Sequence, residues 1–109
     1  MAKFLIQKST NGQYYFVLKA NNSEIILISE MYTQIHSLKN WIQSVIENSY
    51  YDSHYNRLIS MDNKYYFTLE AENGEVIGVS ETYNSKQAME NGIQSVKENA
   101  PLASIESEI

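Results

Sequence analysis

The chain contains an internal repeat with an offset of 51 residues. Residues 14–20, YYFVLKA, match residues 65–71, YYFTLEA, and the match runs without a gap to residues 47–48 and 98–99. Roughly 19 of the 45 positions from 4 to 48 are identical to their counterparts. A sequence period of this length indicates two copies of one supersecondary unit, neither of which buries its apolar side alone. We therefore expect residues 1–109 to form a single domain from repeat 1, about 1–52, and repeat 2, about 53–109.

Within each repeat the pattern predicts three strands. Alternation places Tyr14, Phe16, Leu18 and Ala20 on the core face, and the same pattern recurs at residues 65–71. Asn-Gly at 11–12 favours a type I′ hairpin turn, and Asp-Asn at 62–63 also tolerates left-handed backbone. Further turns are predicted at 22–23 and 73–74, before third strands at 24–29 and 75–80. The third-strand residues expected to face the core are Ile26, Ile28, Ile77 and Val79.

After the third strand the apolar period changes to that of a helix. Leu38, Ile42 and Val45 recur at helical spacing, and Ile35 and Ile46 widen the stripe. The matching residues of the second repeat are Met89, Ile93 and Val96. Ser85 is suited to cap this second helix, and Pro101 predicts its end near Asn99. The segments that follow the helices, residues 50–54 and 102–105, could each add a last strand.

These elements predict an α+β fold. A three-stranded meander with one helix has a small core and exposed edges. Two βββα(β) repeats solve both problems if they share one antiparallel sheet, with both helices packed on one face and an approximate two-fold axis between the repeats.

Charge and composition exclude several functions. The net charge is −5 and Arg57 is the only arginine, so nucleic acid and anionic membrane surfaces are not expected partners. Without cysteine the chain has no disulfide, thiol catalysis or thiolate metal site. The apolar start of the chain is too short for a signal peptide, and no segment is apolar enough to span a membrane. We expect a cytoplasmic location.

A search for catalytic motifs predicts no catalytic residue, cofactor or metal. No phosphate-binding, dinucleotide-binding, zinc-protease or nucleophile-elbow motif is present, and His36 and His54 lack partners at ligand spacing. The most suggestive pattern is Ser-Glu-x-Tyr, at residues 29–32 and again at 80–83. Its residues either form a polar pocket at each strand–helix junction or satisfy the turn, with the tyrosine packed beneath the helix. The residues concerned are Glu30, Tyr32, Glu81 and Tyr83.

Tyr15 and Tyr66 are predicted on the sheet face opposite the core. Exposed aromatics at equivalent positions could form a platform for a peptide or a planar ligand, or could pack against neighbouring strands.

Trp41 of repeat 1 stands at the position that Gly92 occupies in repeat 2, so we expect the two helices to pack differently at this point.

The combined pattern resembles that of the YegP-like family of small bacterial proteins. Repeat 2 carries it best: Tyr65-Tyr66-Phe67-x-Leu69-x-Ala71-x-Asn73-Gly74, then Ser80-Glu81-x-Tyr83 and Asn91-Gly92-Ile93-x-Ser95-Val96. Repeat 1 departs at Ser23 and Trp41, which replace glycines. The resemblance covers nearly the whole chain. It implies βββαβ units that share a sheet and exchange their last strands, and it implies no activity, because the function of the family is unknown.

We therefore expect a non-catalytic binding domain that uses the exposed sheet face or edge to bind a protein, a peptide or a small ligand. The alternative is a small enzyme or ligand-binding protein with its site at the Ser-Glu-x-Tyr junctions. Because two units already lie in one chain, we expect a monomer, with a weak homodimer through sheet edges as the alternative.

Overall fold

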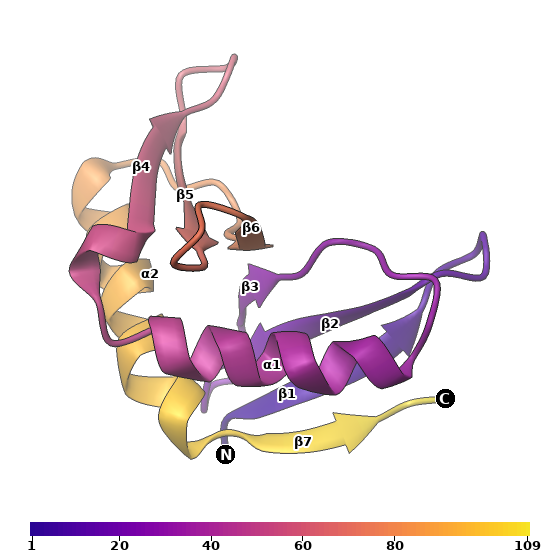
Figure 1. Ribbon diagram of the computed structural model, residues 1–109. Helices are drawn as coiled ribbons and strands as arrows, with labels where there is room; N and C mark the ends of the chain where they lie inside the picture. The colour runs from indigo at the N-terminus through magenta and orange to yellow at the C-terminus, as the bar shows by residue number, and fades with distance from the viewer.

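Seven strands form one sheet in the order β4-β5-β6-β3-β2-β1-β7 in the computed structural model, which describes residues 1–109 (Figure 1). The elements are β1 (Lys3–Lys8), β2 (Tyr14–Lys19), β3 (Ile25–Ile28), α1 (His36–Asn48), β4 (Tyr55–Ile59), β5 (Tyr65–Glu70), β6 (Val76–Val79), α2 (Lys86–Asn99) and β7 (Ser104–Ser107). Short 3-10 turns follow the helices, η1 (Asp52–His54) and η2 (Ala100–Leu102). The α+β fold, the shared sheet and the two repeats are confirmed.

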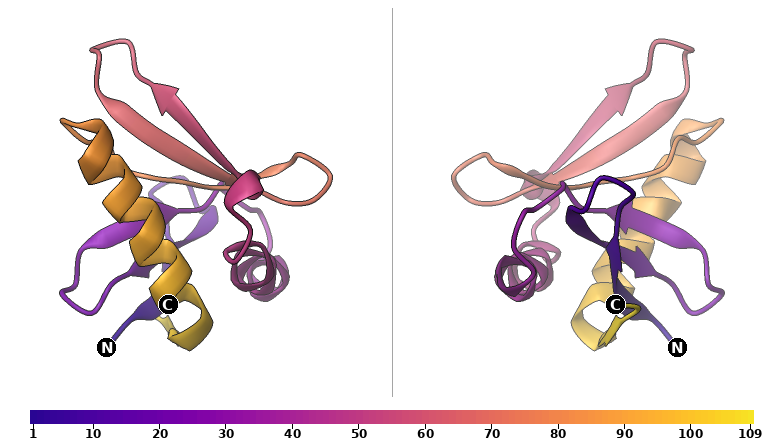
Figure 2. Two further views of the ribbon diagram at one scale, coloured as in Figure 1. Left: turned by 90° about the vertical axis from the view of Figure 1, so that its left-hand side faces the viewer. Right: turned by 90° about the vertical axis from the view of Figure 1, so that its right-hand side faces the viewer.

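The two meanders meet at one point, where β3 pairs with β6 through Ile28 and Val79. The two halves of the sheet are inclined to one another at this join (Figure 2). Each helix contacts strands from both repeats, α1 on β2 and β6 and α2 on β5 and β3. One cluster of 18 buried residues, drawn from both halves of the sheet and both helices, forms the core. The prediction that the repeats complete each other around one interior agrees with this packing.

The last strand crosses to the other repeat. β7 follows α2 yet pairs with β1, Phe4 lying beside Ile105, so the strand exchange implied by the family resemblance is present. This pairing is parallel, and the sheet is antiparallel everywhere else. The prediction of a last strand at 50–54 was wrong. Those residues form a turn and η1, because the chain must reverse there to enter β4.

All four hairpin turns have one geometry, and it is not type I′. In the first, Gly12 N–H donates to the Ser9 carbonyl and only Gly12 has positive φ, at 84°. The matching residues with positive φ are Ser23, Asn63 and Gly74. In each turn the left-handed residue is the fourth, and this gives a three-residue loop, which is longer than the two-residue type I′ connection. The turn positions were predicted correctly, and their type was wrong.

A β-bulge changes the face that the third strand presents. The register shifts between Leu18 and Lys19, so that Leu27 lies opposite Leu18 and points into the core. Ile26 is also buried, as predicted, but Ile28 pairs with Val17 on the outer face. The same shift in repeat 2 keeps Ile77 in the core and puts Val79 outside, opposite Thr68. Simple alternation missed this bulge, so Ile28 and Val79 were assigned to the wrong face.

Leu27 and Gly78 are equivalent positions that complement each other at the pseudo-two-fold axis. A Cβ atom on Gly78 would lie 2.6 Å from the Cδ2 and Cγ atoms of Leu27. The leucine side chain of repeat 1 therefore fills the space that the glycine of repeat 2 leaves. This pair shows that the core depends on the two repeats being different.

The helices begin and end largely as predicted. The Ser85 hydroxyl accepts from the Ala88 N–H at 3.1 Å, and α2 ends at Asn99. Leu38, Ile42 and Val45 of α1 are buried. Ile35 does not widen the stripe, because it lies before the first turn of α1 and is 42% exposed.

Candidate functional site

The serines of the Ser-Glu-x-Tyr pattern hold the end of the strand ladder. Ser29 Oγ accepts from the Phe16 N–H at 2.9 Å and donates to the Glu30 carbonyl at 2.8 Å. Ser80 does the same with Phe67 and Glu81, at 2.9 and 2.7 Å. Both serines are buried. Their repetition therefore reflects a folding requirement.

The tyrosines of the pattern pack differently in the two repeats. Tyr32 stacks on Trp41 of α1, with ring centroids 5.7 Å apart. Tyr83 instead stacks on Phe67, at 6.4 Å, and lies over Gly92 of α2. A Cβ on Gly92 would lie 2.4 Å from the Tyr83 hydroxyl oxygen, so the glycine is needed for this approach. The predicted local asymmetry is present, and the close neighbour of Gly92 is a tyrosine ring.

Each junction tyrosine faces carboxylates from both repeats. Burial raises the pKa of Tyr83, and Glu24 and Glu81 raise it further. Burial, with Glu30 and Glu75, raises the pKa of Tyr32 to about 12. The sequence pattern predicted the nearby glutamate of the same repeat, Glu30 or Glu81. It missed the second glutamate beside each tyrosine, which comes from the turn of the other repeat. The signal available was that this second glutamate also recurs at the 51-residue offset.

A shallow pocket of 460 Å³ lies at the junction of repeat 2. Glu24, Glu81 and Tyr83 line it together with Ser23 and Ile25. At neutral pH a phenol with a raised pKa stays protonated, and its oxygen can accept a hydrogen bond alongside the two carboxylates, which only accept. This combination suits a small cationic group.

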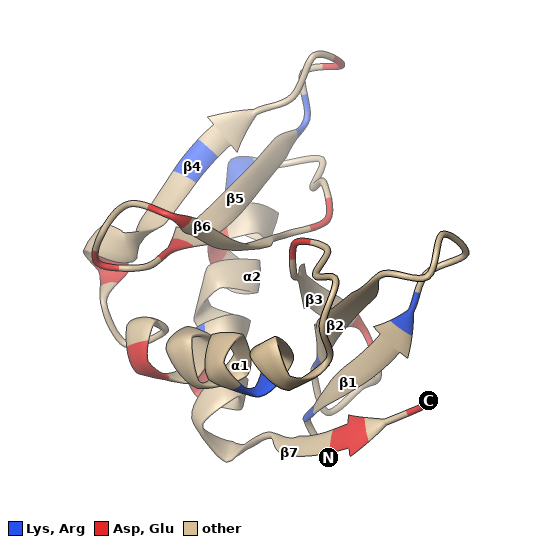
Figure 3. Cartoon of the chain, turned by 45° about the vertical axis from the view of Figure 1, so that its right-hand side comes forward, with Lys and Arg blue, Asp and Glu red and all other residues tan.

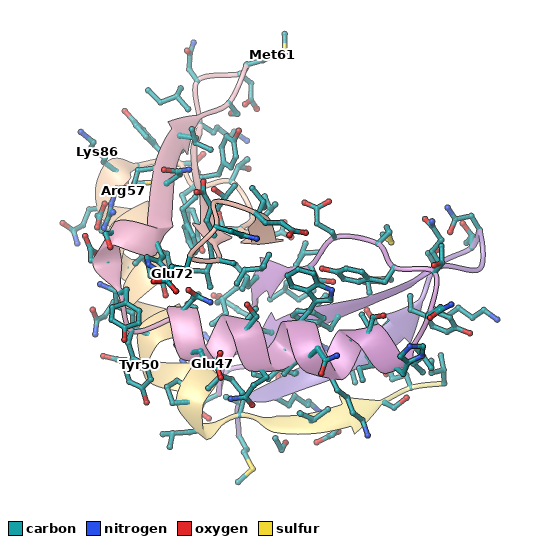
Figure 4. All side chains as sticks on the ribbon, viewed as in Figure 1. Glu47, Tyr50, Arg57, Met61, Glu72 and Lys86 are labelled. Atoms are coloured by element: carbon teal, nitrogen blue, oxygen red, sulfur yellow. The ribbon has the colours of Figure 1, made fainter.

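A larger polar pocket of 630 Å³ separates the C-terminal half of α1 from the β5–β6 turn. His54 lies in it, with Nδ1 2.6 Å from Asn48 Oδ1 and its ring 5.2 Å from that of Tyr51. Glu47 and Glu72 approach the pocket from opposite sides (Figure 4). Spacing in the sequence did not predict a partner for His54, because Asn48 is brought beside it only by the turn after α1. No group of three or more His, Cys, Asp or Glu side chains that could hold a metal ion is found.

Tyr15 and Tyr66 are half-buried and are not neighbours on the sheet. A row of outer-face side chains crosses the strands through Val17, Ile28, Val79 and Thr68. Tyr15 lies two residues before Val17 and Tyr66 two residues before Thr68. Because β2 and β5 run in opposite directions, the tyrosines lie on opposite sides of this row. A single ligand would have to span the row to touch both.

The edge strands of the sheet are β4 and β7, so the equivalent strands β1 and β4 have different neighbours. β7 covers β1, with Ser104 N–H donating to the Ala2 carbonyl and Glu108 N–H to the Ile6 carbonyl. Gln7 Nε2 also donates to Glu108 Oε1, at 2.7 Å. β4 is equivalent to β1 but pairs only with β5. It therefore presents an open edge.

The side chains at the open edge are apolar where those of the covered edge are polar. Leu58 is 37% exposed, Ile59 64% exposed and Met61 fully exposed. Met61 projects from the tip of the β4–β5 turn (Figure 4). The equivalent residues of repeat 1 are Gln7, Lys8 and Thr10. Native proteins usually protect a free edge with charged side chains, so an apolar free edge indicates an interaction surface.

Charged residues lie on β4 and on the turn that precedes it (Figure 3), and ion pairs join them to α2. Arg57 Nε donates to Glu90 at 2.6 Å, and its terminal nitrogen donates to Asp52 at 2.9 Å. Lys97 also donates to Asp52, at 2.9 Å. Hydrogen bonds from Lys97 and then Arg57 lower the pKa of Asp52 to about 2. These exposed pairs lie between β4 and α2. In repeat 1 the residues equivalent to Arg57 and Glu90 are Ile6 and Lys39, which cannot form such a pair.

No helix of the chain is both long and apolar enough to cross a membrane.

The family described as "Domain of unknown function (DUF1508)" matches the chain twice, at residues 9–55 and 60–107. The chain is 50% identical to the UPF0339 protein YegP of Yersinia pestis over 99 residues, covering 91% of this chain and 88% of the relative. It is 44% identical to YegP of Escherichia coli over 96 residues, covering 88% and 87%.

Two solved structures have the same fold. The solution structure of Escherichia coli YegP, a protein of unknown function, superimposes with a TM-score of 0.93 at 39% identity, covering 98% of this chain and 92% of that one. A UPF0339 protein from Shewanella oneidensis gives a TM-score of 0.90 at 42% identity, covering 97% and 90%. The repeated match, the relatives and the fold together place this chain in the DUF1508 family, whose function is unknown.

Proposed function

We propose that the protein is a non-catalytic interaction domain whose binding surface is the open β4 edge of its sheet. The observation that carries this proposal is the contrast between equivalent strands. β1 is covered by β7 and ends in polar side chains, whereas β4 is uncovered and ends in Leu58, Ile59 and the turn residue Met61. An extended segment of a partner would add to such an edge through main-chain hydrogen bonds, and the side chains would give specificity.

The backbone of β4 fits this use. The Ser60 N–H donates to the Lys64 carbonyl, across the hairpin. Because N–H and C=O groups alternate between the two sides of a strand, the groups of Arg57 and Ile59 point away from β5. They supply two donors and two acceptors to an incoming strand.

The test is a selection of ten-residue peptides displayed on phage against the wild-type protein. We expect the selected peptides to bind at least about tenfold more weakly to the double variant Leu58→Lys/Ile59→Lys, since lysines at an edge oppose strand addition. The control, Tyr15→Ala, lies on the outer face away from β4 and should bind them as wild type does. Equal binding to the edge variant, or no selected peptide, contradicts the proposal. Loss only in the tyrosine variant assigns binding to the outer face instead.

A second candidate function is the binding of a small cationic ligand at the junction pocket of repeat 2. The observation that favours it is the meeting of Glu24, Glu81 and Tyr83 around one pocket of 460 Å³. A panel of amines and guanidines should then raise the melting temperature of the wild type. The rise should disappear in Glu24→Gln/Glu81→Gln but persist in the control Glu72→Gln. If no compound distinguishes these proteins, the pocket is not a binding site.

A further inference from the structure

We infer that the partner bound at the β4 edge is a second copy of this chain, paired antiparallel about a two-fold axis at Leu58. The inference rests on the proposed function, because it names the occupant of the same edge. It would join two seven-stranded sheets into one continuous sheet, with β4 beside β4 at its centre.

The hydrogen-bonding groups of the edge fit this arrangement. When Leu58 lies opposite Leu58 of the second copy, Arg57 lies opposite Ile59 of the other chain on both sides of the axis. Both residues direct their N–H and C=O groups outward, so each opposed pair exchanges two hydrogen bonds. A two-fold pair of this kind is self-complementary, because each chain contributes the same surface.

A parallel segment in the position of β7 fits the edge less well. β7 covers β1 from Lys3 to Ile6, which corresponds to residues 54–57 on the other edge. There the Tyr55 N–H already donates to the Asp52 carbonyl of η1. The Arg57 guanidinium is also held at that end, by Glu90 and Asp52. The open part of the edge therefore lies from Arg57 toward the β4–β5 turn, where the two-fold pairing places its contacts.

The side chains are compatible with a second copy. Leu58 lies on the outer face and would contact Leu58 of the other chain, because residues opposed without hydrogen bonds approach most closely. Ile59 would lie beside the aliphatic stem of Arg57 from the second copy. The only charged residue of β4, Arg57, lies opposite Ile59 in this register, so no two like charges of the strands oppose each other. The edge is thus complementary to itself in backbone, and its charges do not oppose the pairing.

The interface is small, since it involves one short strand and one turn from each chain. Interfaces well below about 1,200 Å² in total are typical of weak association. We therefore expect a dimer that forms between about 10 µM and 1 mM, the range in which weak complexes populate.

Sedimentation velocity across that range tests the inference. The wild type should change from monomer to dimer, while Leu58→Lys and Leu58→Asp should each stay monomeric because like charges meet at the axis. A one-to-one mixture of these two variants should dimerise again. The control Gln7→Lys, at the equivalent position of the covered edge, should associate as wild type does. Melting temperatures near that of the wild type show that the variants are folded.

Two results would overturn the inference: a wild type that stays monomeric throughout, or a Leu58→Lys variant that dimerises as strongly as wild type. The peptide selection separates these failures from failure of the proposed function. If the wild type is monomeric but selected peptides still require Leu58 and Ile59, the edge binds another partner and only the identity of the partner is wrong. If edge variants change neither dimer formation nor peptide binding, the proposed function fails as well.

Discussion

β1 and β4 occupy equivalent places in the two repeats, but β1 lies between two strands and β4 has a single neighbour. The difference arises at the link between the repeats. The segment after α2 is free to run along β1, whereas the segment after α1 must enter β4 directly. Fusing two units into one chain therefore leaves β1 covered by β7 and β4 uncovered. The side chains follow the difference, since Gln7 and Lys8 stand where the open edge has Leu58 and Ile59.

The largest expected effect on stability comes from removing β7, which leaves β1 uncovered as β4 is. A chain that ends at Leu102 loses β7 and uncovers the margin of the core beside Phe4 and Ile6. At about 1 kcal/mol for each lost hydrogen bond, we expect the free energy of unfolding to fall by about 3–5 kcal/mol. Urea denaturation measures this loss.

The control for this truncation is a chain that ends at Ser107, which keeps the ladder residues of β7. It should lose at most about 1–2 kcal/mol. If the chain that ends at Leu102 is as stable as the wild type, β7 does not protect β1.

An intermediate effect is expected where the repeats differ inside the core. Gly78→Leu places a side chain in the space that Leu27 fills, and overpacking of this kind costs about 1–3 kcal/mol. The exchange variant Leu27→Gly/Gly78→Leu should recover most of the loss, since the summed volume is restored. Chemical denaturation of the exchange variant and of the two single variants provides the measurement. If the exchange variant is as unstable as the sum of its two single variants, the complementarity is wrong.

The smallest expected effect comes from the ion pairs that cover the start of β4. The folded-state pKa of Asp52 is lowered to about 2, so its pairing with Lys97 and Arg57 stabilises the fold above the ordinary aspartate pKa. This stabilisation is lost as pH falls from about 4 toward 2. Asp52→Asn should therefore be slightly less stable than wild type at pH 7, and the difference should shrink to zero in acid.

Thermal unfolding of both proteins from pH 2 to pH 7 measures that difference. Because these side chains are exposed, added salt should also reduce it. A difference that grows as the pH falls would contradict the assignment.

The fold could be predicted from the sequence because its signals are local and duplicated. The alternation through Phe16 and Leu18, the turn residues and the helix cap at Ser85 each act within a few residues, and each appears in the structure. The β-bulge after Leu18 has no local sequence signal here, which is why Ile28 was assigned to the core. The type of the hairpin turns was missed for a similar reason, because Asn-Gly also fits the longer loop observed.

The candidate sites were less predictable, because they combine residues that are distant in the sequence. Glu81 and Tyr83 were selected as a repeated pattern, but Glu24 joins them only because the turn of repeat 1 reaches the junction of repeat 2. The open edge could not be inferred either. The replacement of Gln7 by Leu58 indicates an interaction surface only when β7 is known to cover β1 and to leave β4 uncovered.

Amide hydrogen exchange followed by NMR tests the difference between the edges most directly. Ile6 and Arg57 are equivalent residues whose backbone groups point outward from β1 and β4. In a dilute sample the Ile6 amide should be protected by β7, while the Arg57 and Ile59 amides exchange rapidly. Raising the concentration should protect Arg57 and Ile59 and leave Ile6 unchanged. Strong protection of Arg57 at the lowest concentration, or rapid exchange at Ile6, would contradict the account.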